Sequence, residues 1–506
     1  MADVPSDVTG RVFPQLPVEL TELIVRSLHP NEAATSFRLV NKAAATQFRG
    51  PDHTTVRLSQ PVPPHAFAAH WLAPGATRGL NLYHRKLLLR LTAASGIVAN
   101  LEVAVQAVGF DLARDICGLA KSAASAGSLE SCRWLKERWC QNSEQLHWYG
   151  ITSSILNASA RAGHRHVCEW LLGAEVLPEQ WAASLTREAA LAAARGGLSD
   201  LADWLLERLK RGVGVAESER SEAEVVEWRS IHVSFLAPTA EGCDLAALQR
   251  LFRRCGLGQL PGAVWTKTEI LDAAAGSRTP DWAAKVEWLE AQGCLPSSIA
   301  VGATAGLPDD GEALARLTWL QGRGYPLAQR SMLTAAGAGN VATLQHVVHN
   351  LAAQLGVAAF QECLQCAAEA AARGGHLAAL QVLWSARGEA KWRQASLAAA
   401  GRGHLHVLAW LIETVRARAV RLDGKLFRWA ASSGSVELMA WLRERGCVWG
   451  DKALVAAAES GCEEAVEWLV ERGCPLSGAY QAYEAASRNG DQAMLRCLRR
   501  LDLASE

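Results

Sequence analysis

The chain has 506 residues, half of them apolar, with 51 basic and 51 acidic side chains. A single hydrophobic core stops growing at roughly 250–300 residues, so this length excludes one globular domain. The composition excludes wholesale disorder, and a net charge of zero gives no long-range attraction to nucleic acid or to an anionic membrane. We therefore expect an ordered multidomain or repeat protein whose partner is a protein, with no nucleic-acid and no membrane partner.

Thirteen cysteines are scattered through Ala- and Leu-rich segments, which indicates reduced thiols and no disulfide framework. Residues 1–12 lack an apolar run followed by a small-residue cleavage site, so we expect a disordered start and no secretory signal. No apolar stretch reaches the roughly 18 residues that span a bilayer. The sequence is typical of an intracellular protein, cytoplasmic or nuclear.

Residues 13–50 are predicted to form a small helical unit. Residues 16–20, Leu-Pro-Val-Glu-Leu, begin a helical pattern that places Leu23, Ile24 and Leu28 on one face. His-Pro-Asn-Glu at 29–32 interrupts this pattern. A second helix should follow, because residues 37–42 supply an apolar stripe with a basic end.

The order Leu-Pro-x-Glu-Leu, Ile and Leu at helical spacing, a break, and then Arg-Leu-Val-Asn-Lys at 38–42 resembles an F-box. F-boxes dock on the small adaptor subunit of cullin-type ubiquitin ligases through apolar residues, while C-terminal repeats select the substrate. The resemblance implies docking or core roles for Leu16, Pro17, Leu20, Ile24, Leu28, Leu39 and Val40. The alternative is a helical cap that covers the apolar face of the first repeat, as terminal repeats require.

Residues 51–90 are predicted to be an ordered linker. Proline and glycine at 61–64 and 74–75 mark turns. Residues 54–59 could form a short strand, and residues 64–72 a short helix.

From residue 91 to residue 506 one phrase recurs: two Ala, two variable residues, a Gly, six residues and then Trp-Leu. A period of about thirty residues indicates a solenoid of stacked units. Counting the turn glycines, faint copies included, gives about 12–13 divergent repeats. The clearest copies contain Gly127 and Trp134, Gly163 and Trp170, Gly197 and Trp204, Gly403 and Trp410, Gly434 and Trp441, and Gly461 and Trp468.

Each unit is predicted to be a pair of helices. The residues before the Gly are short and Ala-rich, which suits a first helix packed closely against its neighbours. After the Gly, positions four, five and eight are usually apolar, as at Val407, Leu408 and Leu411, and share one face of a second helix. No segment of the array alternates apolar and polar residues long enough to make a strand, so we expect an all-α solenoid.

The phrase Ala-Ala-Arg-Gly-Gly-His-Leu at 371–377 resembles the turn between the two helices of an ankyrin repeat. The Thr-Pro-Leu-His opening of the consensus is absent, and Trp occupies a position where the family usually has Leu. The resemblance implies an ankyrin-type solenoid of divergent repeats that holds a protein partner on its concave surface.

The recurring Trp has two interpretations. It could fill the space left by the small Ala side chains of the first helix and so restore packing density, which we favour. The alternative is an exposed aromatic ladder that grips a partner. First-helix residues beside the Ala pair are further candidates for partner contact, although a solvated face also explains them: Arg402, Arg428, Glu459 and Arg488.

The sequence contains no phosphate loop, nucleophile elbow, zinc-protease helix or kinase signature. Cys363-Leu-Gln-Cys366 is a lone CxxC, and buried thiols on an Ala-rich helix explain it better than a metal. His164, His376 and His404 each follow a turn Gly, so hydrogen bonds at the turn explain them better than catalysis. We expect no catalytic residue, no metal and no cofactor.

These features predict a protein–protein interaction module and not an enzyme. The F-box resemblance implies a substrate receptor of a cullin-type ubiquitin ligase, in which the head docks the adaptor and the array binds the substrate. The alternative is a plain ankyrin scaffold whose N-terminal helices only cap the solenoid. A remote alternative is an enzyme with an unrecognised pocket near an exposed insertion at residues 207–235.

Overall fold

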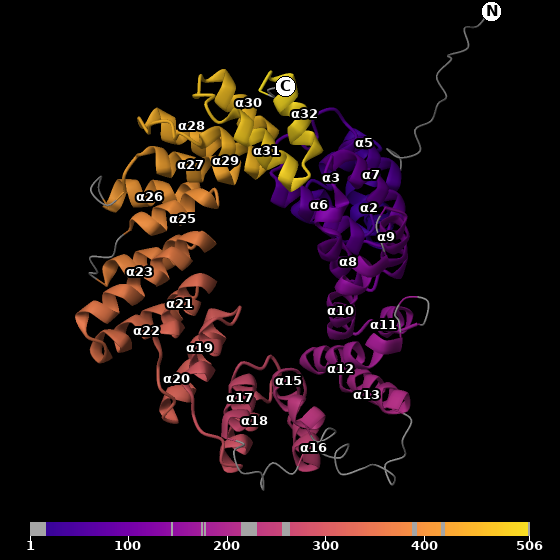
Figure 1. Cartoon of the computed structure of the whole chain (residues 1–506), viewed down its shortest axis with the longest axis vertical. Helices are drawn as coiled ribbons and strands as arrows, with labels where there is room; N and C mark the ends of the chain where they lie inside the picture. The colour runs from indigo at the N-terminus through magenta and orange to yellow at the C-terminus, as the bar shows by residue number, and fades with distance from the viewer. Residues whose placement is uncertain are drawn as a thin grey trace, which may run out of the picture.

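The computed structural model describes residues 17–142, 145–173, 176, 179–213, 230–255, 264–386, 392–415 and 420–503. In this part of the chain the regular structure is helical, and the only β-type pairing is an isolated bridge between Phe110 and Asp491. Thirteen consecutive helix pairs, from α6–α7 to α31–α32, form one curved array (Figure 1). The all-α fold class and the helical-repeat solenoid predicted from the sequence are confirmed.

The first helix of each pair lies on the inner side of the curve and the second on the outer side (Figure 1). The inner helices are α6 (Leu82–Ala94), α8 (Ile116–Ser125), α10 (Gln145–Ala162), α12 (Glu179–Arg195), α15 (Leu236–Gly242), α17 (Val264–Ala275), α19 (Ser298–Ala305), α21 (Gln329–Ala338), α23 (Val357–Gly374), α25 (Arg393–Gly401), α27 (Gly424–Ser433), α29 (Ala453–Ser460) and α31 (Ala479–Asn489). The outer helices are α7 (Val98–Val108), α9 (Leu129–Asn142), α11 (Arg165–Leu171), α13 (Ser199–Val213), α16 (Leu245–Cys255), α18 (Trp282–Ala291), α20 (Asp310–Gly322), α22 (Val341–Gln354), α24 (Leu377–Ser385), α26 (Leu405–Val415), α28 (Val436–Glu444), α30 (Glu463–Glu471) and α32 (Gln492–Arg500).

The turn between the two helices of a pair explains the recurring glycine. Gly127 has φ 74°, and the backbone N–H groups of Gly127 and Ser128 donate to Ala124 O and Ala123 O at 3.1 and 2.9 Å. This is a Schellman cap, which favours Gly because the left-handed conformation is strained for residues with a Cβ. The same conformation occurs at the other five glycines of the clearest copies, Gly163, Gly197, Gly403, Gly434 and Gly461.

The stretched repeats in the middle of the array close their turns differently. Lys285, which is fully buried, donates from Nζ to Ala240 O and Cys243 O of the preceding turn at 2.8 and 2.7 Å. Asn340 donates in the same way to Ala305 O and Leu307 O. Polar side chains from the next repeat therefore satisfy carbonyl groups that would otherwise be buried without partners.

The core is a layer of small and large apolar side chains. Ala123 and Ala124 on an inner helix, and Leu135 on the following outer helix, are fully buried, and this arrangement recurs along the array. One buried cluster runs from Val62 to Phe235, and a second begins at Leu236 and runs to Leu503. The first pair begins with α6, upstream of the expected boundary at residue 91, because its first helix precedes Gly96.

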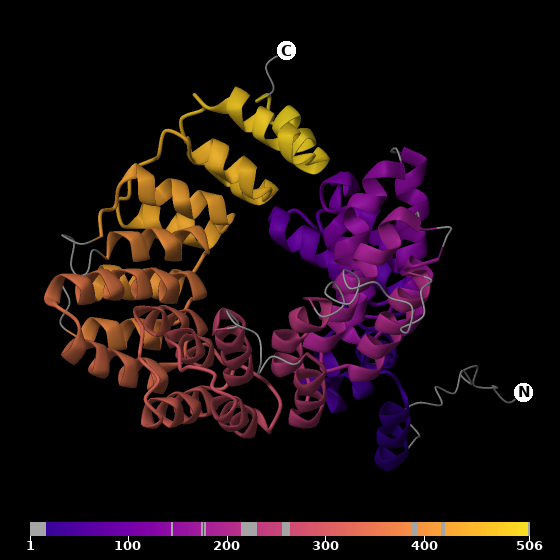
Figure 2. The ribbon, with the colours of Figure 1, turned by 60° about the horizontal axis from the view of Figure 1, so that its bottom comes forward.

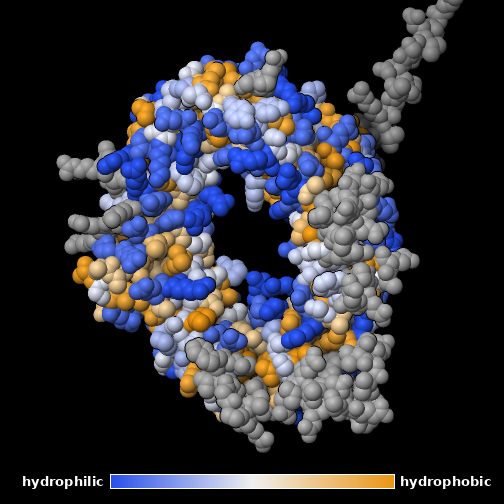
Figure 3. All heavy atoms as spheres, in the orientation of Figure 1, coloured by the Kyte–Doolittle hydropathy of each residue, from blue (hydrophilic) through white to orange (hydrophobic). Residues whose placement is uncertain are grey.

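The two ends of the array meet, so the solenoid closes into a ring around an opening lined largely by hydrophilic residues (Figures 1 and 3). The backbone of Asp111 donates to Gly490 O, and that of Ala493 donates to Gly109 O, both at 3.1 Å. Asn81 Nδ2 donates to Ser433 O at 2.9 Å. We call this contact the clasp. It joins residues 78–85 and 109–111 to residues 433–434, 461–467 and 490–496.

An ion pair lies at the centre of the clasp. Arg85 and Asp491 are 1% and 0% exposed, and Arg85 Nη1 donates to Asp491 Oδ1 at 2.8 Å. The same guanidinium donates to Gly461 O at 2.6 Å and to Val108 O at 3.0 Å. Arg78 pairs with Glu467 near the edge of the contact. Buried charges persist only when they are paired and hydrogen-bonded, and both conditions are met here.

The N-terminal segment forms a small helical unit, the head, with α1 (Val18–Ser27), α2 (Pro30–Thr35), η2 (Phe37–Leu39), α3 (Lys42–Gln47) and α4 (Pro51–Thr54). Its core is separate from that of the array and contains Val25, Ala33, Phe37, Ala44 and Phe48. In Figure 2 the head projects from the ring beside the N-terminus. The disordered start expected at residues 1–12 lies outside the described residues.

The strand expected at residues 54–59 is absent, and this part of the prediction is wrong. Residues 55–59 have no neighbouring strand to pair with, and a side chain satisfies the backbone instead. Asn31, which is fully buried, accepts from Arg57 N at 2.8 Å and donates to Arg57 O and Pro61 O at 2.8 and 3.0 Å. The helix expected at 64–72 is present as α5 (Pro64–Trp71).

Candidate binding surfaces

The head has an uncovered apolar face. Leu20, Leu39 and Val40, three of the residues to which the F-box resemblance assigns docking or core roles, are 46%, 67% and 59% exposed. Val18 and Leu23, at 56% and 63%, extend the same kind of surface along α1. Several exposed large apolar residues on one small unit are typical of protein–protein contact sites. Pro17 is also exposed, whereas Leu16 lies outside the described residues.

Two of the assigned residues have a different position. Ile24 and Leu28 pack against the core of the head and are only partly accessible. Leu23, which shared their predicted helical face, points away from that core. Helical spacing alone did not separate these residues, because three neighbouring positions on a short helix span both its buried and its exposed sides.

Among the described residues, no extensive contact joins a helix of the head to the first repeat. Helix α5 of the linker packs on α7 instead, and it contributes Phe67, 2% exposed, to the core of the array. Val62 joins the same core, and its carbonyl accepts from Asn100 Nδ2 at 2.8 Å. The capping role that was the alternative for residues 13–50 therefore falls to the linker.

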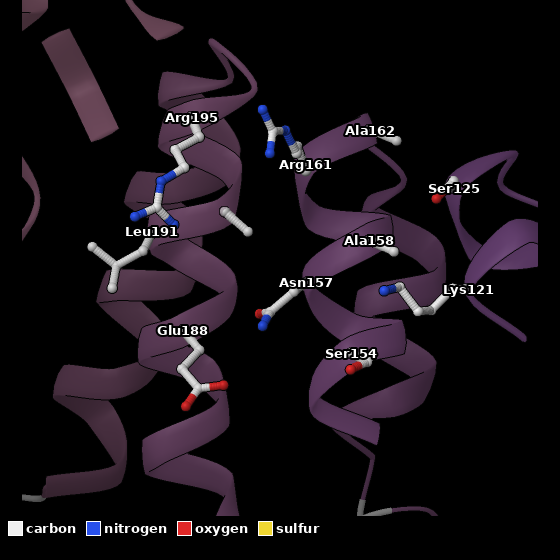
Figure 4. Close-up of a pocket in the computed structure, with 11 residues that line it drawn as sticks. Lys121, Ser125, Ser154, Asn157, Ala158, Arg161, Ala162, Glu188, Leu191 and Arg195 are labelled. Carbon is white, nitrogen blue, oxygen red and sulfur yellow. The ribbon is translucent and has the colours of Figure 1, made fainter. Parts of the chain in front are cut away.

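The inner wall carries a trough, lined by both polar and apolar side chains, across α6, α8, α10 and α12. One hollow of about 590 Å³ and another of about 660 Å³ share Lys121 and Ser125, so they adjoin each other. In Figure 4, Asn157 and Arg161 of α10 lie opposite Glu188, Leu191 and Arg195 of α12. The first hollow is lined by Lys121, Ser125, Ser154, Asn157, Ala158, Arg161, Ala162, Glu188, Leu191, Ala192 and Arg195.

Two guanidinium groups at the trough share one carboxylate. Arg161 Nη2 and Arg195 Nε lie 3.4 and 3.8 Å from the two carboxylate oxygens of Glu241 on α15. All three side chains are between 40% and 58% exposed, so these ion pairs are weak and solvent-screened. Glu188 accepts a hydrogen bond from Ser153 at 2.5 Å. The linings of the two hollows therefore contain four cations, one of them Arg90 of α6, and only one carboxylate.

A third hollow, of about 570 Å³, lies farther along the array, across α27, α29 and α31. It brings together Arg428, Glu459 and Arg488, three of the four first-helix residues proposed from the sequence as partner contacts. The fourth, Arg402, is exposed on the preceding repeat. Trp429, 39% exposed, adds an aromatic ring that packs over Gly401.

The six recurring Trp residues are half-buried on the outer helices, where they pack against the two cores: Trp134, Trp170, Trp204, Trp410, Trp441 and Trp468. Arginines cover several of the rings. Arg445 lies 3.8 Å from the ring centre of Trp441, and Arg165 lies 4.7 Å from that of Trp204. These rings lie on the side of the array away from the opening, so they do not contribute to the inner wall.

The histidines that follow turn glycines form hydrogen bonds from one repeat to the preceding one, as the sequence predicted. His164 Nε2 lies 3.0 Å from Ser125 O, and His376 Nε2 lies 3.1 Å from Gly337 O. His404 makes the same contact with Arg373 O at 3.1 Å. Their recurrence reflects the geometry of the repeat.

The cavity nearest the predicted insertion has a volume of about 110 Å³ and is lined in part by Asp203, His232 and Cys243. Burial raises the pKa of the Cys243 thiol, and its Sγ lies 3.5 Å from Ala194 O. A protonated, buried thiol is unsuited to act as a nucleophile. Most of the insertion, residues 214–229, lies outside the described residues.

Within the described ranges, no group of three or more His, Cys, Asp or Glu side chains is arranged to hold a metal ion. The Cys363-x-x-Cys366 pair contains one buried and one exposed thiol on α23. Likewise, no helix in the described ranges is both long and apolar enough to cross a membrane.

No protein-family model matches the sequence, and no curated protein matches it either. Among solved structures, the chain is similar to the pentatricopeptide repeat protein PPR10 from maize. The two are 11% identical, the alignment covers 97% of this chain and 91% of the maize chain, and the TM-score is 0.21. The assignment of this chain to the helical-repeat class rests on its own helix pairs, which make it a scaffold suited to binding.

The expectation that nucleic acid is excluded as a partner is wrong. The physical error lies in the use of net charge, which describes the field of the whole chain at a distance. A bound partner meets local groups instead, and the inner wall presents cations such as Lys121 and Arg428.

Proposed function

We propose that the protein is a substrate receptor, in which the head docks a cullin-type ligase adaptor and the inner wall of an ankyrin-type array binds a protein substrate. The observation that carries this proposal is the uncovered apolar face of the head. A helical unit that merely capped the array would bury its apolar side chains there. Instead, Leu20, Leu23 and Leu39 are exposed while the head keeps a core of its own.

The geometry would also allow the head and the inner wall to bind different proteins at the same time. The head projects from the outside of the ring (Figure 2). The first and third hollows described above are lined by inner helices, at α8, α10 and α12 and at α27, α29 and α31. An adaptor on the head and a substrate on the inner wall would not compete for the same surface. The proposal includes no catalytic step in this chain, because a receptor of this kind only brings two proteins together.

The test is binding of the purified full-length chain to the adaptor subunit of a cullin ligase. Leu23→Asp and Leu39→Asp each place a charge on the exposed face and should weaken binding at least tenfold, since hot-spot truncations typically cost about 2 kcal/mol. The matched control is Leu295→Asp, because Leu295 is 60% exposed but lies on the array.

All three variants should fold normally, since the substituted side chains are on the surface. Adaptor binding that is undetectable with the wild-type chain, or equal in Leu23→Asp and Leu295→Asp, would refute the docking role.

A further inference from the structure

We infer that the trough across α6, α8, α10 and α12 binds an extended, acidic segment of a protein partner. This inference depends on the proposed function only in that the partner of the inner wall is a protein. It does not depend on the adaptor.

The length of the trough fits an extended peptide. Its four inner helices are neighbours in the order α6, α8, α10 and α12. Packed helices lie about 8–10 Å apart, so three spacings span roughly 24–30 Å. At about 3.3 Å per residue, an extended chain of roughly seven to nine residues covers this distance.

The charges of the trough favour carboxylates. Lys121, Arg161 and Arg195 come from three successive inner helices. Glu241, reaching in from α15, already lies between the two guanidinium groups at 3.4 and 3.8 Å. It demonstrates that a carboxylate fits between them, and its long contacts leave both guanidinium groups with free donors. An Asp or Glu of a partner would compete with Glu241 for this position.

Asn157, at the centre of the trough, supplies a group suited to a peptide backbone. Its Oδ1 is buried and has no hydrogen-bond partner among the described residues, and its Nδ2 makes only a 3.4 Å contact with Ser153 Oγ. The terminal torsion of Asn rotates easily. A small rotation would present both a donor and an acceptor, which matches the C=O and N–H groups of one extended residue.

The lining favours a peptide over a nucleic acid. Single-stranded nucleic acids are held by aromatic rings that stack on successive bases, and the two hollows of the trough have no aromatic residue in their lining. Leu191, together with Ala158 and Ala192, forms an apolar surface for the small side chains that alternate with the acidic ones.

The test uses the full-length chain and a dye-labelled peptide of about nine residues, alternating Asp and Ala, with blocked ends. Arg161→Gln and Arg195→Gln should each weaken binding about fivefold, since one surface ion pair contributes up to about 1 kcal/mol. Glu241→Gln should strengthen binding, because it removes the internal competitor. Asn157→Ala should weaken it without changing its dependence on salt.

Lys452→Gln is the matched control, since it removes one cation from the third hollow, which lies across α27, α29 and α31 and outside the trough. It should leave peptide binding unchanged. A peptide with Lys in place of Asp should not bind. The side chains of Arg161 and Arg195 are 58% and 46% exposed, so loss of folding is not expected, and circular dichroism verifies this.

Three results would overturn the inference. Glu241→Gln could weaken binding, or Lys452→Gln could weaken it as much as Arg161→Gln does. Alternatively, a thymidine oligonucleotide of similar length could bind more tightly than the peptide and respond to the same variants, which would make the trough a phosphate site. Adaptor binding is measured on the same samples. Loss of adaptor binding alone counts against the docking role, and loss of peptide binding alone counts against this site.

Discussion

The contacts between neighbouring repeats and the clasp hold the same ring together by different means. Between repeats, small apolar side chains such as Ala430 and Ala431 and larger ones such as Leu442 are fully buried, and the pattern recurs in unit after unit. The clasp occurs once and relies on Arg85, Asp491 and backbone hydrogen bonds. Apolar packing is non-directional and can be repeated, whereas a buried ion pair is specific to one geometry. The comparison indicates that burial of apolar side chains stabilises each successive repeat, whereas the hydrogen bonds and the ion pair of the clasp determine where the two ends of the array meet.

Breaking the ion pair of the clasp should have the largest effect. Arg85→Met leaves the Asp491 carboxylate buried without its partner, which typically costs about 3–5 kcal/mol. The clasp should therefore open. Hydrogen exchange of residues 461–496 should accelerate, and the radius of gyration from small-angle scattering should increase.

A double variant sharpens this expectation. Asp491→Asn keeps an oxygen to accept from Met494 N at the start of α32 but removes the charge. Arg85→Met combined with Asp491→Asn should recover part of the loss, because no uncompensated charge remains. If Arg85→Met alone leaves exchange and scattering unchanged, the clasp does not hold the ends together in solution.

Truncating a core residue between repeats tests the other half of the comparison. Leu442→Ala removes a fully buried side chain of α28 and should lower the free energy of unfolding by about 2–5 kcal/mol. The lower free energy of unfolding should be measurable by urea denaturation followed by circular dichroism. Unlike in Arg85→Met, the clasp should stay closed until the array unfolds. Leu476→Ala, at a residue 45% exposed, is the control and should change stability by less than about 0.5 kcal/mol.

A pair of glycines separates the strain of a turn from the close approach at the clasp. Gly461 and Gly473 have nearly the same φ, 77° and 72°. A Cβ at Gly461 would lie 2.6 Å from Arg85 Nη2, whereas a Cβ at Gly473 would meet nothing within 4 Å. Both Gly→Ala variants should therefore lose about 1–2 kcal/mol from the left-handed conformation. Gly461→Ala should lose more and should also accelerate exchange at the clasp. Equal losses would mean that the clasp tolerates the added methyl group.

The candidate surfaces were recoverable from the sequence only in part. Arg428, Glu459 and Arg488 follow from their place in the repeat, and the structure brings them to one hollow. Arg161 and Arg195 occupy comparable places on their own first helices, so the same rule could have identified them. Asn157 was not recoverable, because its significance lies in an unsatisfied amide. In the head, the F-box resemblance named exposed Leu39 and Val40, but it also named half-buried Ile24 and left out exposed Leu23.

By itself the sequence determined the local structure: helix pairs, their turns and their buried faces. These depend on contacts within one repeat or between adjacent ones, where the spacing of Gly, Ala and Leu encodes them directly. Only the tertiary structure decided that the array closes into a ring. Arg85 and Asp491 are 406 positions apart, and neither belongs to the repeating phrase. Small rotations from unit to unit add up along the solenoid, and their sum, which no single repeat specifies, brings these two residues together.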